Sequence, residues 1–227
     1  MKVLIFDTET TGLSKSKIIS KETMHLWPFI VQFSYIIFDT KNYRTLKMYD
    51  KIIKLKPYNV ISQESTNLHG ITNEISESEG INLIDTLNEF LIDIKKVDLI
   101  VAHNMDFDIS MVKIELLRLI NEYQINENTK QILENYFNVI INLNNLHCTM
   151  RKSVDLCQIE RENVRGKYFK FPSLSELHVK LFNIEPNNLH NSLNDILITL
   201  RCFIKLTHNR DVIKYNKRIK NLVTPLL

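Results

Sequence analysis

Residues 2–13 of the chain read KVLIFDTETTGL, an apolar run followed by two acids, three threonines and a glycine. An apolar run bounded by a turn signal is typical of a buried strand, so residues 3–6 are predicted to lie inside a sheet. Side chains alternate along a strand, so Asp7 and Glu9 point the same way if the extended backbone continues to them. Two neighbouring carboxylates repel, and a divalent cation with oxygen ligands would offset that repulsion. A lone Asp-x-Glu is more often a solvated turn, so a metal site here depends on other acids.

Apolar patterns elsewhere predict a mixed sheet with helices packed on it, in an α/β fold. Further strands are expected at residues 29–38, 45–55, 99–102 and 146–149. Helices are expected where apolar side chains recur at helical spacing, at residues 81–96, 107–123, 173–182 and 193–206. A short turn at 39–43 would join the second and third strands as an antiparallel hairpin, and Ser173 and Glu176 have the spacing of a capping box.

The remaining segments are polar and weakly periodic. Residues 15–26 and 124–146 are interpreted as insertions, the second holding one irregular helix at 131–137. Two other segments are expected to be turns or loops, at residues 61–75 and 155–171.

Composition limits the class of protein. The chain has 227 residues, of which 44% are apolar and 24% charged, and we predict a single domain over residues 1–227. The net charge of +3 permits a nucleic-acid partner without requiring one. Three cysteines without a Cys-x-x-Cys pair argue against a disulfide framework and favour a reducing, intracellular setting. No run of about 18 apolar residues occurs, so a soluble protein without a membrane span is expected.

Other polar residues occur where they could join the first two acids. Asp108 follows an expected strand at the start of a helix, with Asp106 as its local rival. Asp195 lies near the start of another helix, five residues after His190. An acid in the first turn of a helix also interacts favourably with the helix dipole, so each acid has a plain structural interpretation as well. His69 precedes a glycine in a segment that could line a pocket or serve as a connector.

In this order, the groups resemble the motifs of the DEDDh 3′–5′ exonucleases, the superfamily of DNA polymerase III epsilon-type proofreading subunits and ribonuclease T. Residues 6–13 look like its first motif, residues 102–108 like its second, and His190 followed by Asp195 like its third. The resemblance extends over residues 2–206 and is weakest over the two insertions.

The resemblance implies a ribonuclease H-like fold, with a five-stranded mixed sheet flanked by helices. It also implies a 3′–5′ exonuclease that releases nucleoside 5′-monophosphates with two Mg²⁺ ions, which Mn²⁺ can replace. By this carry-over, Asp7 would bridge both ions, Glu9 and Asp195 would complete the shell of the first, and Asp108 would hold the second through water. His190 would be the general base, since an imidazole can take a proton from water at neutral pH.

The same resemblance implies contacts with the terminal nucleotide, made by Thr10, Thr11, Leu13, His69 and Asn104. Ser192 stands where the family usually has alanine, and we expect a minor packing change from it. Basic side chains could line the path of a strand, although a solvated surface explains each equally well: Lys15, Lys17, Lys21, Arg151, Lys152, Arg161, Arg165 and Lys167.

The expected partners are 3′ ends of single-stranded DNA or RNA, and replication or repair proteins are further candidates. DNA is the favoured substrate, and an RNA-directed exonuclease is the alternative, because contacts to a 2′-hydroxyl cannot be read from these motifs. A non-catalytic, polymerase-associated subunit is a weaker alternative, because all four carboxylates and His190 are present. A location in the cytoplasm or nucleus and a viral or phage source are both compatible with the sequence.

Overall fold

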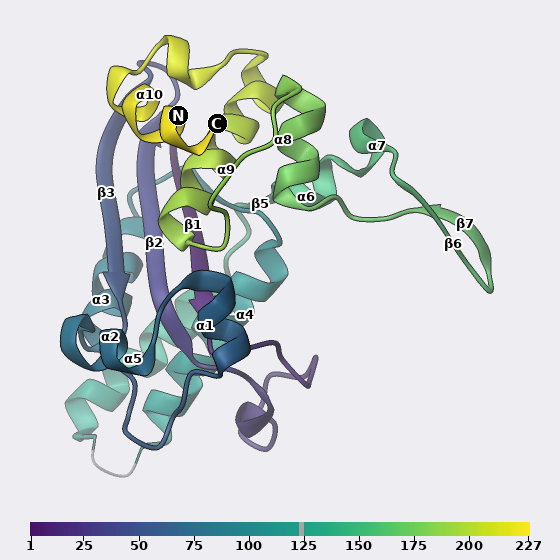
Figure 1. Cartoon of the computed structure of the whole chain (residues 1–227). Coiled ribbons are helices and arrows are strands. Elements are labelled where there is room, and N and C mark those ends of the chain that lie inside the picture. The colour runs from purple at the N-terminus through teal and green to yellow at the C-terminus, as the bar shows by residue number, and fades with distance from the viewer. Residues whose placement is uncertain (123–124) are drawn as a thin grey trace.

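The sheet has five strands in the order β3-β2-β1-β4-β5, as a computed structural model shows for residues 1–122 and 125–227 (Figure 1). Its strands are β1 (Lys2–Thr10), β2 (Ile30–Asp39), β3 (Arg44–Ile52), β4 (Leu99–Ala102) and β5 (Leu146–Cys148). β1 is antiparallel to β2 and parallel to β4. The five-stranded mixed sheet that the sequence predicts is therefore confirmed.

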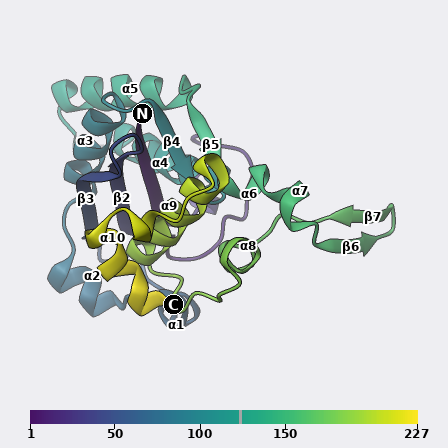
Figure 2. The ribbon, with the colours of Figure 1, turned by 90° about the horizontal axis from the view of Figure 1, so that it is seen from above.

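Helices cover both faces of this sheet, as the view from above shows (Figure 2). One face carries α3 (Leu83–Ile94), α4 (Met105–Ile120) and α5 (Glu127–Ile141). The other carries α8 (Leu174–Phe182), α9 (Ser192–His208) and α10 (Lys217–Val223). Shorter elements are α1 (Gln63–His69), α2 (Asn73–Glu79), α6 (Thr149–Lys152), α7 (Val154–Cys157) and 3-10 turns at Met24–Leu26, Val212–Lys214 and Thr224–Leu226.

β1 is the central strand because its apolar residues meet helices on both sides. Val3, Leu4, Ile5 and Phe6 are fully buried. Leu4 and Phe6 pack in the cluster that contains α3 and α4, whereas Val3 and Ile5 pack in the cluster that contains α9. Because side chains alternate along a strand, Asp7 lies on the α9 side of the sheet.

The segment at 61–75 is helical, and the prediction of a turn there is wrong. Ser62 and Thr72 each accept a hydrogen bond from a backbone N–H three residues later and thereby cap α1 and α2. Gly70, with φ of 78°, ends α1 in the left-handed conformation that glycine adopts without strain. The polar residues that suggest a turn in the sequence are helix caps.

The predicted loop at 155–171 is also wrong, because it contains a two-stranded hairpin of β6 (Glu160–Asn163) and β7 (Gly166–Phe169). This hairpin projects away from the rest of the molecule (Figure 1). The capping box of Ser173 and Glu176 is confirmed at the start of α8.

α5 is a regular helix and extends beyond the irregular helix predicted at 131–137. Its Leu133 and Ile140 belong to the core cluster beside α4. The predicted helix end at Tyr123 and the predicted start of an insertion at residue 124 lie outside the described residues. In the part of the chain that the structure describes, no helix is both long and apolar enough to cross a membrane.

Candidate active site

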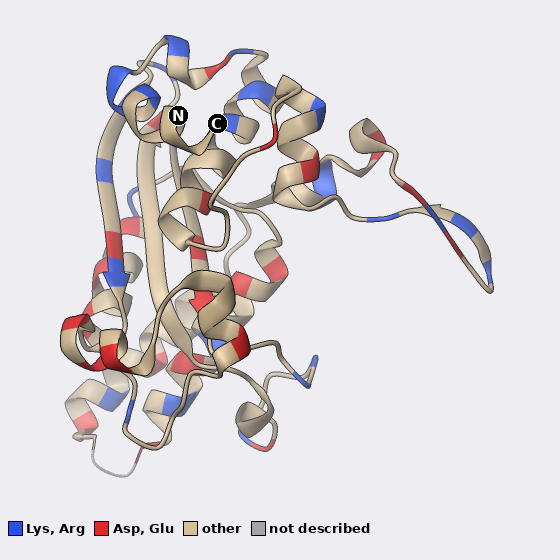
Figure 3. Ribbon diagram, in the orientation of Figure 1, with Lys and Arg blue, Asp and Glu red and all other residues tan. Residues whose placement is uncertain are grey.

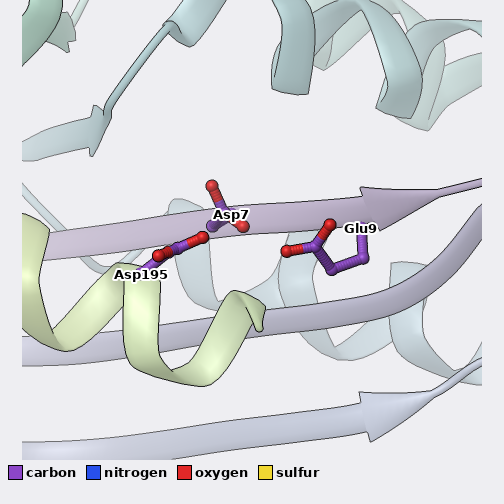
Figure 4. A group of neighbouring side chains, drawn as sticks. All are labelled: Asp7, Glu9 and Asp195. Carbon is purple, nitrogen blue, oxygen red and sulfur yellow. The ribbon is translucent and has the colours of Figure 1, made fainter. Parts of the chain in front are cut away.

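Three carboxylates from β1 and α9 converge on one point (Figure 4). One oxygen each of Asp7, Glu9 and Asp195 lies within 4.8 Å of the other two. β1 remains extended as far as Thr10, so its two acids share a face, as their spacing predicts. α9 packs across that face and carries Asp195 in its first turn. The sheet and the helix together build the cluster.

Burial makes this cluster electrostatically costly without a cation. It raises the pKa of Asp7 well above its usual value, and the charges of Asp108, Asp195 and Glu9 raise it further. Burial also raises the pKa of Glu9 to about 7. Mainly through burial, the pKa values of Asp108 and Asp195 rise to about 8. These acids cannot all be ionised at neutral pH unless positive charge joins them.

The hydrogen bonding of Asp195 fits a bound cation. Its Oδ2 accepts a hydrogen bond from the backbone N–H of His190 at 3.2 Å. Its Oδ1 is buried and has no hydrogen-bond donor among the residues that the structure describes. A buried oxygen without a partner is unfavourable, whereas a carboxylate oxygen facing two others is a suitable ligand for Mg²⁺ or Mn²⁺. Asp7, Glu9 and Asp195 are therefore suited to hold a divalent metal ion.

Asp108 lies beside this cluster, held by the backbone and side chain of Thr8. Its Oδ1 accepts hydrogen bonds from Thr8 N at 3.0 Å and from Thr8 Oγ1 at 2.9 Å. Asp106, its rival in the sequence, is exposed and forms an ion pair with Arg151. The structure thus places Asp108, and not Asp106, next to the acidic cluster.

His190 occupies the loop before α9 and has an exposed side chain. Its backbone is left-handed, with φ of 67°, and its N–H binds Asp195 as described. Burial lowers the pKa of the His69 imidazole, and the nearby His190 lowers it further. Buried His69 accepts a hydrogen bond from Ile71 N at its Nδ1. Its Nε2 has no partner among the described residues.

The residues after Glu9 form a tight loop next to the cluster. Thr10 Oγ1 donates to the carbonyl of Gly12 at 2.7 Å, and Thr11 exchanges two hydrogen bonds with the backbone of Phe29. This bonding leaves Leu13 85% exposed. A large apolar side chain held outward beside an acidic cluster can pack against a ligand.

Asn104 precedes α4 in the left-handed conformation, with φ of 72°, and its side chain caps no N–H group. The adjacent His103 has both ring nitrogens occupied, by Thr149 Oγ1 at 3.0 Å and the Pro172 carbonyl at 3.1 Å. Burial lowers the pKa of His103 to about 4, so its neutral ring holds this corner together. Asn104 is exposed and remains free to contact a ligand.

The role of Ser192 was missed by sequence reasoning, which predicts only a packing change. The Ser192 hydroxyl is fully buried and lies 2.5 Å from that of Ser34 on β2. Ser192 N donates to the Gln32 side chain at 3.2 Å, and both Gln32 and Ser34 donate to Asp50. Two polar residues within an otherwise apolar strand were the signal in the sequence. Asn191, the residue before it, caps α9.

A comparison with known protein families matches most of the chain. The model of the RNase_T family, described as "Exonuclease", matches residues 4–203. The sequence matches no curated protein.

Solved structures share the fold at low sequence identity. Escherichia coli exonuclease I in complex with a dT13 oligonucleotide is 19% identical, with a TM-score of 0.59 over 97% of this chain and 45% of its own. A 3′-exonuclease bound to a histone mRNA stem-loop is 13% identical, with a TM-score of 0.56 over 92% of this chain and 82% of its own. The chain spans less than half the length of exonuclease I. These similarities confirm the expected ribonuclease H-like fold.

Proposed function

The chain belongs to the RNase_T exonuclease family, and on that premise we propose that it removes nucleotides from 3′ ends as a DEDDh-type enzyme. The products are nucleoside 5′-monophosphates, and single-stranded DNA is the favoured substrate. The observation that carries the proposal is the convergence of Asp7, Glu9 and Asp195 around a buried carboxylate oxygen that has no hydrogen-bond donor among the described residues. The family resemblance of the sequence motifs and the raised pKa values of these acids support the same conclusion.

Each candidate side chain has a defined task in this proposal. Asp7, Glu9 and Asp195 would hold one Mg²⁺ ion, and Asp108, oriented by Thr8, would help to hold a second. Such ions, which Mn²⁺ could replace, would supply neutralisation of the phosphate charge and a lower pKa for the attacking water. His190 accepts the proton of that water, and the hydrogen bond from its backbone to Asp195 keeps the loop beside the cluster.

The substrate side is formed by the loop after β1 and by the start of α4. Thr10 and Thr11 contact the 3′-terminal nucleotide, and exposed Leu13 packs beside its base. Asn104 and His69 border the same strand. A bound oligonucleotide of DNA in one structural neighbour and an RNA stem-loop in another keep the RNA-directed alternative open.

The test is a time course of hydrolysis on 3′-labelled single-stranded DNA, duplex DNA and RNA of the same sequence. We expect Mg²⁺-dependent release of labelled mononucleotides, fastest from single-stranded DNA, and no release with a chelator. Asp195→Asn should nearly abolish it, whereas the matched control Asp106→Asn, which removes an exposed acid, should retain it. Faster release from RNA would favour the alternative substrate. Binding without any metal-dependent cleavage would favour a non-catalytic subunit.

A further inference from the structure

The hairpin of β6 and β7, here called the arm, extends from the body without a core of its own. All eight residues of its two strands are exposed. Its ribbon stands clear of the sheet and helices in both views (Figures 1 and 2). An isolated two-stranded hairpin is at best marginally stable in water. A binding partner would therefore add to its stability.

The two faces of the arm differ in charge. Cross-strand partners lie on the same face of a hairpin, and Arg161 pairs with Tyr168. The opposite face combines two acids, one lysine and one phenylalanine, because Glu160 pairs with Phe169 and Glu162 pairs with Lys167. One face, defined by Arg161 and Tyr168, therefore carries no acid. Figure 3 shows Lys and Arg together with acids along the arm.

The two arginines of the arm differ from Lys167 in their ion pairing. Lys167, on the opposite face, lies 3.9 Å from Glu160 and is partly neutralised by it. Within the described ranges 1–122 and 125–227, neither Arg161 nor Arg165 at the tip forms an ion pair. Tyr168 is 47% exposed beside Arg161. An exposed aromatic ring next to unpaired guanidinium groups is suited to a partner with flat bases and phosphates.

The base of the arm is attached close to the acidic cluster. His103 Nε2 bonds to the carbonyl of Pro172, which follows the arm. Ile5 of β1 pairs with Val101 of β4, so His103 is about level with Asp7 on the neighbouring strand. A strand whose 3′ end lies in the cluster can continue along the arm.

We infer that the acid-free face of the arm and its tip bind single-stranded nucleic acid upstream of the cleaved bond, with Tyr168 stacked on a base, Arg161 on a phosphate and Arg165, at the tip, on another. This rests on the proposed function in taking nucleic acid as the ligand. Stacking tolerates any base, so the arm adds affinity without reading sequence.

The test compares matched substitutions on the two faces. Tyr168→Ala is paired with Phe169→Ala, and Arg161→Gln with Lys167→Gln, which removes the same charge from the opposite face. Fluorescence anisotropy, with a chelator present, measures binding of a labelled tetranucleotide and of a strand about five times longer. Tyr168→Ala should weaken binding of the longer strand about 5- to 150-fold, and Arg161→Gln should lower the salt dependence by about 0.7 in slope. The tetranucleotide should bind each variant as it binds the wild type.

Equal weakening by both members of each pair would overturn the face assignment. If none of the four substitutions weakens binding, the proposal is overturned, and a protein partner would be the alternative ligand of the arm. Melting temperatures of the variants control for unfolding, and release of mononucleotides from the tetranucleotide is measured separately. If Tyr168→Ala weakens binding but the wild type never cleaves, the proposed role of the arm is supported and the proposed hydrolysis is wrong. If the wild type cleaves but the two members of each pair of variants bind the longer strand equally well, the proposed role of the arm is wrong and the proposed hydrolysis is not affected.

Discussion

Asp195 shows how one side chain links a candidate ligand to a candidate base. Its Oδ2 accepts a hydrogen bond from the backbone N–H of His190, and its Oδ1, which has no donor among the described residues, is available to a cation. The hydrogen bond to Asp195 uses only the main chain of His190. A substitution at His190 can therefore remove the imidazole while leaving the position of Asp195 unchanged.

Replacing His190 tests whether its imidazole acts in catalysis and not in substrate binding. Asparagine is the suitable substitute because the position has φ of 67°, which asparagine tolerates better than alanine. We expect His190→Asn to lower kcat at neutral pH by about 10²- to 10⁴-fold with little change in affinity. Raising the pH should partly restore the rate, because hydroxide then forms without a base. A pH–rate profile identical to that of the wild type would show that His190 is not the base.

At the scale of elements, the start of α9 is fastened to the sheet by polar contacts inside an apolar layer. Ser192 reaches Ser34 through its hydroxyl and Gln32 through its N–H. Asp195 follows three residues later, within the first turn. These contacts hold the helix in the orientation that brings Asp195 to β1.

The hydroxyl of Ser192 should contribute to stability more than to catalysis. We expect Ser192→Ala to lower the free energy of unfolding by about 1 kcal/mol, the usual contribution of one hydrogen bond. The loss should not be larger, because Ser34 keeps its hydrogen bond to Asp50. Urea unfolding measures the change, and Ser78→Ala, which removes an exposed hydroxyl bound to Glu74, is the control. A loss no greater than that of the control would show that the buried pair is not stabilising.

At the scale of the whole molecule, the fold brings acids together at a cost to its own stability. The pKa values of Glu9, Asp108 and Asp195 are raised to about 7, 8 and 8, whereas unfolded carboxyl groups titrate near 4. The folded state therefore holds protons that the unfolded state releases. This contribution to stability is complete below about pH 4 and is lost as the pH rises through about 7 to 8.

Melting curves of the metal-free protein test this directly. With a chelator present, the melting temperature should fall between about pH 5 and about pH 8, contrary to the behaviour of a protein stabilised by paired carboxylates. Asp195→Asn should flatten this dependence, because it removes one of the acids with a raised pKa. A wild-type melting temperature that rises over this interval would contradict the charge repulsion inferred here.

A cation should reverse the effect by binding only the folded state. Mn²⁺ at a hundredfold excess over Kd stabilises by about 2.7 kcal/mol and should raise the melting temperature. Asp7→Asn should melt higher than the wild type without metal, since one repelling charge is gone, and should respond less to Mn²⁺. Asp106→Asn, an exposed acid outside the cluster, is the matched control and should respond as the wild type does. Equal responses of the wild type and Asp7→Asn would show that Asp7 is not a ligand.

The positions of the five strands could be predicted from the sequence, because burial leaves runs of apolar residues, whereas their order in the sheet emerged only from the structure. The spacing of Asp7 and Glu9 also predicted their common face, which depends only on the alternation of an extended chain. The predictions failed at 61–75 and 155–171. Polar residues occur equally in helix caps, in loops and, as in the arm, in a hairpin that is exposed on both faces, so a polar pattern alone does not distinguish these structures.

Only the tertiary structure decided which acids meet. Asp106 and Asp108 both lie in the first turn of α4, so the local sequence offers no reason to choose between them. β4 ends at Ala102, which leaves the N–H of Thr8 without a partner strand, and Asp108 accepts its hydrogen bond instead. Likewise, the meeting of Asp195 with β1 depends on how α9 packs across the sheet. The sequence determined which residues could carry the chemistry, and packing between distant segments determined which of them share a site.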